Sequence, residues 1–370
     1  MHAAIVSVHP LYDTRIENHI RSLLEWGHTV TYVNWSDLSD SWRLAGEPGV
    51  ELIHRRAPQF FRSRPAQYLR MLGWFTANLV RLAPDLVHIH DPQLLPTVFP
   101  LRLASRARLV FDAHEHYLRT SGPVGRFLKL LYRTALPCVH GLVATSPSVG
   151  RELPAPSTVV PNHQRRAEFS KCAEPTAKDG PCRRLVYFGS LASSDRDVEL
   201  LLDVATTVLR EDERARFELG GPSGDERLRR RFDELARDQG ARFRYHGVMP
   251  RETVVRATAG ADIGFLLIRS GAENILGASP NKIFEYTAAG VAIVATDGFQ
   301  VADEVRRSGA GLLFPPGVPP ATLSGQVLEL LRDGRRLDEM KRNSARLGEQ
   351  YSWEAAAEGY RRLYSTLGLA

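Results

Sequence analysis

The sequence predicts an α/β protein built from two doubly wound parallel sheets. Short apolar segments of strand length alternate with amphipathic segments of helix length in both halves of the chain. The 370 residues are too many for one ordinary hydrophobic core and suggest two domains. Between the halves, residues 162–181 lose apolar periodicity and gather lysine, glutamate, proline and glycine, which is typical of a linker.

The first strand-helix-strand unit places a polar loop at a sheet edge. Residues 3–8 are a buried-strand candidate, Asp13 or Thr14 can cap the helix that follows, and residues 29–33 form the next strand. Doubly wound sheets bind ligands at the carboxyl ends of strands, so the loop His9–Arg15 lies where chemistry is expected. It carries no G-x-G-x-x-G fingerprint, which argues against an NAD-dependent dehydrogenase.

Two further apolar segments of the first half end in polar residues. Residues 84–92 and 108–116 read as parallel strands, and they deliver His90, Asp91 and His114 to one sheet edge. An imidazole at that edge can donate a hydrogen bond to a sugar hydroxyl or to a developing charge near neutral pH. The alternative is that these histidines are structural or simply exposed.

The sequence predicts no metal site and a reducing compartment. In a strand, His114 and His116 would share a face, but no third ligand is specified. The three cysteines are odd in number and lack the close spacing of a zinc or redox pair. The chain has no run of about 18 uncharged apolar residues, and its N-terminus leads directly into a strand-like segment. We therefore predict a cytoplasmic protein.

Composition and charge indicate a globular protein that does not bind nucleic acid. Apolar residues make up 43% of the chain and charged residues 24%, as in ordinary globular domains. The net charge is +6, but the arginines are scattered among acidic residues rather than gathered in a stripe, and no nucleic-acid-binding module appears.

Residues Arg55–Arg81 mix arginines with aromatic residues and predict a basic amphipathic helix. We favour the interpretation that the aromatic side chains belong to the core. The alternative is that Arg55–Phe75 contacts an anionic membrane surface or a partner.

The second half repeats the strand-helix pattern. The segment 184–191 is a strand that runs into a glycine turn, and Arg196 lies at the start of the helix that follows. A guanidinium and the free N–H groups of a helix N-terminus can converge there on a phosphate, although a surface role between two aspartates is the alternative. Further strands are predicted at 217–222, 243–250 and 261–267, and helices at 323–331, 337–347 and 353–367.

The segment Ser279–Tyr286 delivers one cation and one carboxylate into the first turn of a short helix that ends at Gly290. Lys282 at a helix N-terminus makes an anion site suited to phosphate. Glu285 can accept hydrogen bonds from two hydroxyls, such as those of a ribose. A nucleotide site is the functional interpretation, and an exposed ion pair at helical spacing is the alternative.

Six motifs, taken in order along the chain, carry a family likeness: His9–Arg15, His90–Pro92, Asp112–Glu115, Pro161–Asn162, Tyr187–Gly189 and Ser279–Tyr286. Their combination resembles glycosyltransferase family four, the group-one glycosyltransferases of the GT-B fold. The likeness extends to Tyr351–Trp353 and the helix after it, which in this fold commonly crosses back to the first domain. It implies two Rossmann-like domains that face each other across a cleft.

The resemblance implies roles for individual residues. Glu285 falls on the carboxylate that holds the ribose, Arg196 near the basic residue on the diphosphate, and His114 on the histidine beside the reacting sugar. We therefore predict that His114, Arg196 and Lys282 are catalytic. The predicted donor-binding residues are Gly189, Ser190, Val248, Met249, Ser279, Pro280, Asn281 and Glu285, and the predicted acceptor-binding residues are His9, Pro10, Asp13, Arg15, His90 and Asp91.

Two positions depart from the family pattern. The family often has a second glutamate eight residues before Glu285, where this chain has Gly277, and Glu273 is the nearest substitute. It often has an arginine after the glycine of the Tyr187–Gly189 turn, where this chain has Ser190. The first departure leaves open how the sugar hydroxyls are held, and the second moves more of the phosphate binding to Arg196 and Lys282.

The resemblance also implies a domain plan and an activity. We expect an acceptor-binding domain at 1–165, a linker at 166–182, a nucleotide-sugar-binding domain at 183–350 and a returning helix at 351–370. The expected activity is metal-independent transfer of a sugar from a nucleotide-sugar, with retention of configuration and no cofactor. The acceptor stays open between a glycan, a lipid-linked molecule and a natural product. The rival functions are a sugar-nucleotide epimerase of the same fold and a non-catalytic nucleotide-sugar-binding protein.

Overall fold

The computed structural model of the chain describes residues 1–9, 13–36, 42–56, 65–119, 122–170, 182–191, 195–271, 281–299 and 301–369. These residues form two compact units. The first consists of Met1–Asn162 and Glu354–Ala370, and the second of His163–Trp353. The C-terminal helix thus belongs to the first unit, although it follows the second in sequence.

The first unit contains a parallel sheet of seven strands in the order β3-β2-β1-β4-β5-β6-β7. The strand order reverses between β1 and β4, which makes this the switch point where doubly wound sheets bind ligands. The strands are β1 (His2–Ser7), β2 (Thr29–Ser36), β3 (Val50–Arg56), β4 (Leu86–Ile89), β5 (Arg108–Ala113), β6 (Gly141–Ala144) and β7 (Thr158–Val159).

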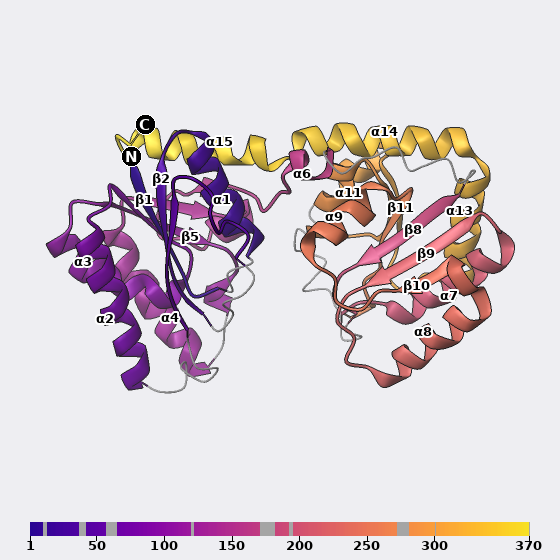
Figure 1. Cartoon of the computed structure of the whole chain (residues 1–370), viewed down its shortest axis with the longest axis horizontal. Coiled ribbons are helices and arrows are strands. Elements are labelled where there is room, and N and C mark those ends of the chain that lie inside the picture. Colours follow the sequence, from indigo (N-terminus) through magenta and orange to yellow (C-terminus); the bar gives the residue numbers. More distant parts are fainter. Residues whose placement is uncertain are drawn as a thin grey trace. The chain divides into compact units, whose positions relative to one another are not determined.

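Helices cover both faces of this sheet (Figure 1). The alternation of strand side chains decides what each face contains. Val87 and Ile89 join one core with α2, α3 and α4, so His88 between them points to the opposite face, toward α1 and α15. The helices are α1 (Thr14–Glu25), α2 (Pro65–Leu82), α3 (Val98–Ala104), α4 (Gly122–Ala135), α5 (Pro147–Gly150) and α15 (Trp353–Thr366).

The second unit contains a parallel sheet of six strands in the order β10-β9-β8-β11-β12-β13, again with one reversal, between β8 and β11. The strands are β8 (Arg183–Phe188), β9 (Ala215–Gly220), β10 (Phe243–Tyr245), β11 (Ile263–Leu266), β12 (Ala292–Thr296) and β13 (Gly311–Phe314). This is the second doubly wound sheet that the sequence predicts.

Two helical layers sandwich the second sheet (Figure 1). Helices α7, α8 and α13 pack on one face, and α9, α11 and α12 on the other. The helices of this unit are α6 (Arg166–Ser170), α7 (Val198–Glu211), α8 (Glu226–Gln239), α9 (Arg251–Ala259), α11 (Asn281–Ala289), α12 (Ala302–Ser308), α13 (Pro320–Arg332) and α14 (Gly334–Gln350).

The structure corrects the sequence analysis in two elements. Arg55 and Arg56 belong to strand β3, so Arg55–Arg81 is not one helix; helix α2 begins at Pro65. On α2, Met71, Phe75 and Leu79 are buried, as expected for an amphipathic core helix. Strand β13 was also not predicted. Among the described residues, no helix has both the length and the apolar composition that crossing a bilayer requires.

Candidate functional site

The first unit carries a group of buried polar side chains beside its switch point. His88 and His90 come from the end of β4, and Asp112 and His114 from the end of β5, on the sheet face opposite the core shared with α2, α3 and α4. We call these four residues, together with those that bond to them, the Asp112 cluster. The ends of the adjacent strands β4 and β5 thus bring together two of the predicted residues, His90 and His114.

Asp112 is fully buried and is neutralised by Arg15. The guanidinium Nη2 of Arg15 lies 3.0 Å from Oδ1 and 2.9 Å from Oδ2 of Asp112, and its Nη1 donates to the Val160 carbonyl over 2.8 Å. Tyr360 of α15 donates to Oδ2 over 2.5 Å. Burial alone would raise the pKa of Asp112, but Arg15 and the neighbouring histidines together outweigh burial and hold that pKa well below its ordinary value. The structure therefore places Arg15 beneath the cluster, as a support for Asp112.

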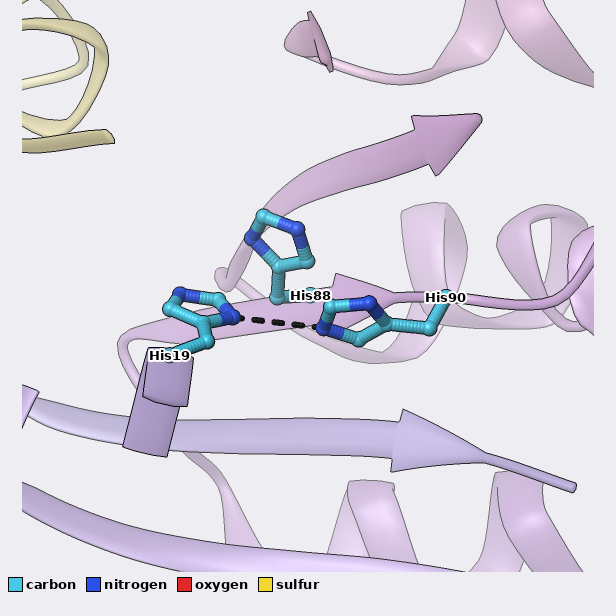
Figure 2. Close-up of side chains that lie close together, drawn as sticks. All are labelled: His19, His88 and His90. Carbon is cyan, nitrogen blue, oxygen red and sulfur yellow. Dashed lines mark hydrogen bonds between the residues drawn. The ribbon is translucent and has the colours of Figure 1, made fainter. Parts of the chain in front are cut away.

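The imidazoles of the cluster contact one another in series. His114 Nε2 lies 2.9 Å from His90 Nδ1, and His90 Nε2 lies 3.2 Å from His19 Nδ1 (Figure 2). The Tyr364 hydroxyl of α15 joins His19 Nε2, at 2.6 Å, to His88 Nδ1, at 2.7 Å.

All four of these histidines stay neutral near pH 7. Burial lowers the pKa of His19, His88 and His90 below the ordinary 6.5, and lowers the pKa of His114 to about 4. Their contacts are therefore hydrogen bonds between neutral rings.

Two sets of these side chains lie close enough to hold a metal ion: His19, His88 and His90, and His90, Asp112 and His114. The observed contacts favour hydrogen bonding instead. Figure 2 shows the His88 nitrogens on the side of the ring away from the His19–His90 contact. Asp112 is already bonded to the Arg15 cation, which disfavours a second cation beside it.

The exposed edge of the cluster contains His9 and His114, whose side chains are 31% and 11% exposed, and the buried Asp91 lies beside them. His9 Nε2 lies 3.2 Å from Asp91 Oδ1, and the His9 ring stacks on the His114 ring with centroids 5.5 Å apart. Asp91 Oδ2 accepts a hydrogen bond from the Val8 backbone over 2.8 Å. Asp13 caps α1 by accepting from the Ile16 backbone over 3.0 Å. Pro10 lies outside the described residues.

In the second unit, Glu285 is a buried carboxylate between two cations, and we call this arrangement the Glu285 cluster. Its Oε1 accepts from Arg251 Nη1 over 2.9 Å, and its Oε2 from Lys282 Nζ. Burial raises the pKa of Glu285, but Lys282 and Arg251 more than offset this, so the net pKa is below the ordinary value. Only 6% of the Glu285 side chain is exposed, so the interpretation as an exposed ion pair is wrong.

Lys282 lies against the glycine turn that follows β8. A Cβ atom on Gly189 would come within 3.1 Å of Lys282 Cε, so the lysine stem passes directly over this glycine. Gly221 in turn approaches the Gly189 carbonyl so closely that a Cβ would lie 1.7 Å from its oxygen. The backbone at Gly189 and Ser190 is therefore held beside the lysine. Of the other predicted residues, Asn281 begins α11, and Ser279, Pro280, Glu273 and Gly277 lie outside the described residues.

Arg196 and the Val248–Met249 pair complete the predicted donor residues. Arg196 pairs through its backbone with Ile268 at the end of β11, contacts Asp195 over 3.1 Å, and is 19% exposed in its side chain. Its positive charge lies near the buried Tyr187, where it offsets part of the rise in the Tyr187 pKa that burial causes. Val248 is 77% exposed, whereas Met249 packs against Gly220 and the core of the α9 and α11 face.

Sequence reasoning assigned no role to six polar residues of these clusters: Arg251, Asp112, His19, His88, Tyr360 and Tyr364. Arg251 opens α9 directly after the predicted Val248–Met249 pair, and its position there was the available signal. It also donates to Gln164 over 2.6 Å. Asp112 stands within a quoted motif but was not assigned a role. His19 and Tyr364 gave no local signal, because their partners are far away in sequence.

The fold of the whole chain is similar to that of several solved structures. The chain is similar to a sucrose-phosphate synthase from Thermosynechococcus elongatus, with 15% identity, a TM-score of 0.65 and 99% of each chain covered. It is similar to HepE from Anabaena in complex with UDP-glucose, with 14% identity, a TM-score of 0.66 and 100% of both chains covered. A putative UDP-N-acetylglucosamine 2-epimerase from Listeria monocytogenes gives 12% identity, a TM-score of 0.66, and coverage of 99% of this chain and 95% of that one. No curated protein matches the sequence.

The two Rossmann-like sheets and these likenesses identify the fold as GT-B, as the sequence predicts. At the level of sequence, a glycosyl transferase 4-like domain matches residues 12–166, and the glycosyl transferases group 1 match residues 182–333. The two matches together span most of the chain. The protein belongs to the group 1 glycosyltransferases of glycosyltransferase family four, which confirms the resemblance drawn from its motifs.

Proposed function

We propose that the protein is a retaining glycosyltransferase that takes a sugar from a nucleoside diphosphate sugar. The observation that carries this proposal is the Glu285 cluster: a buried, ionised carboxylate and a lysine lie in the first turns of one helix, against a glycine turn that leaves backbone accessible. Ribose hydroxyls donate to such a carboxylate, and a diphosphate binds such a lysine. The HepE structure contains UDP-glucose, so uridine diphosphate sugars are the first donors to test.

The donor site needs positive charge where the leaving group forms. Breaking the bond between the anomeric carbon and the phosphate oxygen leaves an oxocarbenium-like sugar and a diphosphate of growing negative charge. Cations aimed at that phosphate lower the barrier. We assign this role to Lys282 and Arg196, with the N-terminus of α11, and propose that transfer needs no divalent ion.

Retention of configuration requires attack from the face that the phosphate leaves. In the proposed step, the acceptor hydroxyl forms its bond to the anomeric carbon on that face while its proton passes to the departing phosphate oxygen. The step is balanced without an enzymic nucleophile. We assign the acceptor side to the first unit, with His9 and His114 at the exposed edge of the Asp112 cluster and Asp91 beside them.

We consider three classes of acceptor. A glycan, a lipid-linked molecule and a natural product are the candidates. For a lipid-linked acceptor, contact of the segment Arg55–Phe75 with an anionic membrane surface would bring the protein to its substrate. Phe75 itself is buried and residues 57–64 lie outside the described part of the chain, so among the described residues the contact would involve exposed arginines such as Arg56 and Arg70. Sedimentation with vesicles that contain anionic lipid, compared with neutral vesicles, tests that contact.

A sugar-nucleotide epimerase is the second candidate, because the chain is similar over nearly its whole length to a putative epimerase from Listeria monocytogenes. Purified protein incubated with a panel of nucleotide-sugars, with and without cell extract, separates the two functions. Nucleoside diphosphate release that depends on extract supports transfer, and isomerised sugar formed without extract supports epimerisation. Binding without turnover would indicate a non-catalytic protein, and loss of transfer on adding EDTA would contradict the metal-free proposal.

A further inference from the structure

Six residues of the first unit form a continuous series of polar contacts, which we call the histidine relay. They come from β4, α1, α15 and the segment at the end of β5, and all but His114 are fully buried or nearly so. In order, the relay consists of Asp112, His88, Tyr364, His19, His90 and His114.

A neutral imidazole has one N–H donor and one acceptor nitrogen. Each inner ring of the relay uses both nitrogens on relay neighbours, so the tautomer of one ring dictates that of the next. Tyr364 passes the same constraint on, because a hydroxyl that donates to His88 accepts from His19. The relay as a whole can therefore point in only two directions.

Asp112 selects between these directions. Arg15 keeps its carboxylate ionised, and a carboxylate only accepts. His88 Nε2 lies 3.6 Å from Asp112 Oδ2 and has no hydrogen-bond partner among the described residues. An N–H at this nitrogen is attracted by the carboxylate, whereas a lone pair is repelled.

We propose that Asp112 and Tyr364 are positioning residues that fix His114 in the tautomer protonated at Nε2. With His88 protonated at Nε2, its Nδ1 accepts from Tyr364, the Tyr364 oxygen accepts from His19 Nε2, His19 Nδ1 accepts from His90 Nε2, and His90 Nδ1 accepts from His114 Nε2. The remaining nitrogen of His114, Nδ1, is then a hydrogen-bond acceptor at the exposed edge of the cluster.

One contact favours the opposite direction. His90 Nδ1 lies 3.7 Å from Asp112 Oδ2, so an N–H there would also be attracted. However, this nitrogen is already bonded to His114 Nε2 over 2.9 Å, whereas His88 Nε2 has no hydrogen-bond partner among the described residues and lies 3.6 Å from Asp112 Oδ2. The His88 contact therefore decides the direction.

The consequence for the ligand depends on the proposed function. A His114 that accepts at Nδ1 binds a group that donates a hydrogen bond, such as a sugar hydroxyl, and repels a phosphate or carboxylate oxygen. The opposite tautomer would do the reverse. The relay thus explains how a site that handles a charged donor can keep one position for a neutral hydroxyl.

Long-range ¹H–¹⁵N NMR correlation of the histidine rings, on the full chain labelled with ¹⁵N-histidine at pH 7.5, tests the relay directly. The resonances are assigned with single histidine substitutions. We expect His114 in one tautomer, with Nε2 protonated and Nδ1 unprotonated. A His114 protonated at Nδ1 would overturn the proposal.

Tyr364→Phe cuts the relay while keeping the ring, so His114 should change from one tautomer to a mixture of two. The matched control is Tyr132→Phe, which removes a buried hydroxyl that has no hydrogen-bond partner among the described residues. It should leave the His114 tautomer unchanged. If Tyr364→Phe leaves it equally unchanged, the relay does not set it.

Asp112→Asn offers a second test, because the amide can donate to His88 Nε2 and reverse the whole relay.

Catalysis is measured separately: Tyr364→Phe should lower kcat several-fold and leave nucleotide affinity, which resides in the second unit, unchanged. An unchanged kcat beside a mixed His114 tautomer would overturn the role of Tyr364 in catalysis. A fixed tautomer in a protein without transferase activity would refute the proposed function but not the relay.

Discussion

Arg251, the first residue of helix α9, and Glu285, the fifth residue of helix α11, are joined by a 2.9 Å hydrogen bond. Lys282 bonds to the other carboxylate oxygen, so two cations share one buried anion. This sharing has a consequence for donor binding. In the proposed donor complex, Lys282 would turn toward the diphosphate while Arg251 still neutralises Glu285, so the carboxylate would stay ionised and able to accept from ribose hydroxyls.

Lys282→Ala should lower turnover by about 10²-fold or more, because it removes a cation from the place where the leaving diphosphate gains charge. Steady-state kinetics with the donor identified from the nucleotide-sugar panel checks this. Lys129→Ala, which removes an exposed lysine from α4 of the first unit, serves as the matched control and should be near normal. Near-normal turnover of Lys282→Ala would remove the lysine from the mechanism.

Arg196→Ala should have a comparable effect, about 10²-fold on kcat, if its guanidinium shares the diphosphate charge. Arg210→Ala removes an arginine that is 66% exposed near the end of α7, the helix that follows Arg196, and it controls for the loss of one positive charge. Equal kinetics for the two variants would assign Arg196 a structural role beside Tyr187.

Arg251→Ala should destabilise the second unit by about 2–3 kcal/mol, because it removes the donor to Glu285 Oε1 and to Gln164 Oε1 and leaves Lys282 as the one cation on the buried carboxylate. Urea unfolding measures this. Arg256→Ala, an exposed arginine on the same helix, should change stability by less than about 0.5 kcal/mol.

By calorimetry, Glu285→Ala should weaken nucleotide binding more than Arg251→Ala does. The reverse order would make Arg251 the nucleotide contact and Glu285 its support.

Gly221→Ala should disrupt the turn beside Lys282. The backbone at Gly221 has φ +138°, and an added Cβ would lie 1.7 Å from the Gly189 carbonyl oxygen, so we expect a loss of about 3 kcal/mol or more. Gly224→Ala lies three residues further on, with nothing within 4 Å of its added Cβ, and should be almost neutral. Equal melting temperatures for the two variants would contradict the close approach of the turns.

Particular residues show how far the sequence could predict this fold and its site. An apolar run that ends in polar residues marks the end of a parallel strand, and this placed His90 and His114 together correctly. Period-two alternation also explains why His88 and Asp112 share a face. Strand β3 was missed because it is a half-exposed edge strand whose sequence ends in basic residues.

The partners of those histidines could not be predicted from sequence. His19 sits on an ordinary amphipathic helix, and Tyr364 lies 345 residues away from it on the last helix of the chain. Only the folded first unit brings both onto one sheet face. Arg251 is similar, because its role depends on the packing of α9 against α11. Local pattern identifies strand ends, whereas buried polar partners depend on tertiary packing.

Acidification should destabilise the first unit between about pH 6.5 and pH 4. The folded pKa values of His19, His88, His90 and His114 all lie below the ordinary 6.5, that of His114 at about 4. In this range the unfolded chain binds more protons than the folded one, so stability is full above the unfolded pKa and falls as the pH decreases. Each such proton contributes a slope of about 1.4 kcal/mol per pH unit. Urea unfolding at several pH values measures the slope, and His114→Asn should make it shallower by the share of one proton. Stability that stays constant or rises from pH 7 to pH 5 would show that these rings are not held neutral by burial.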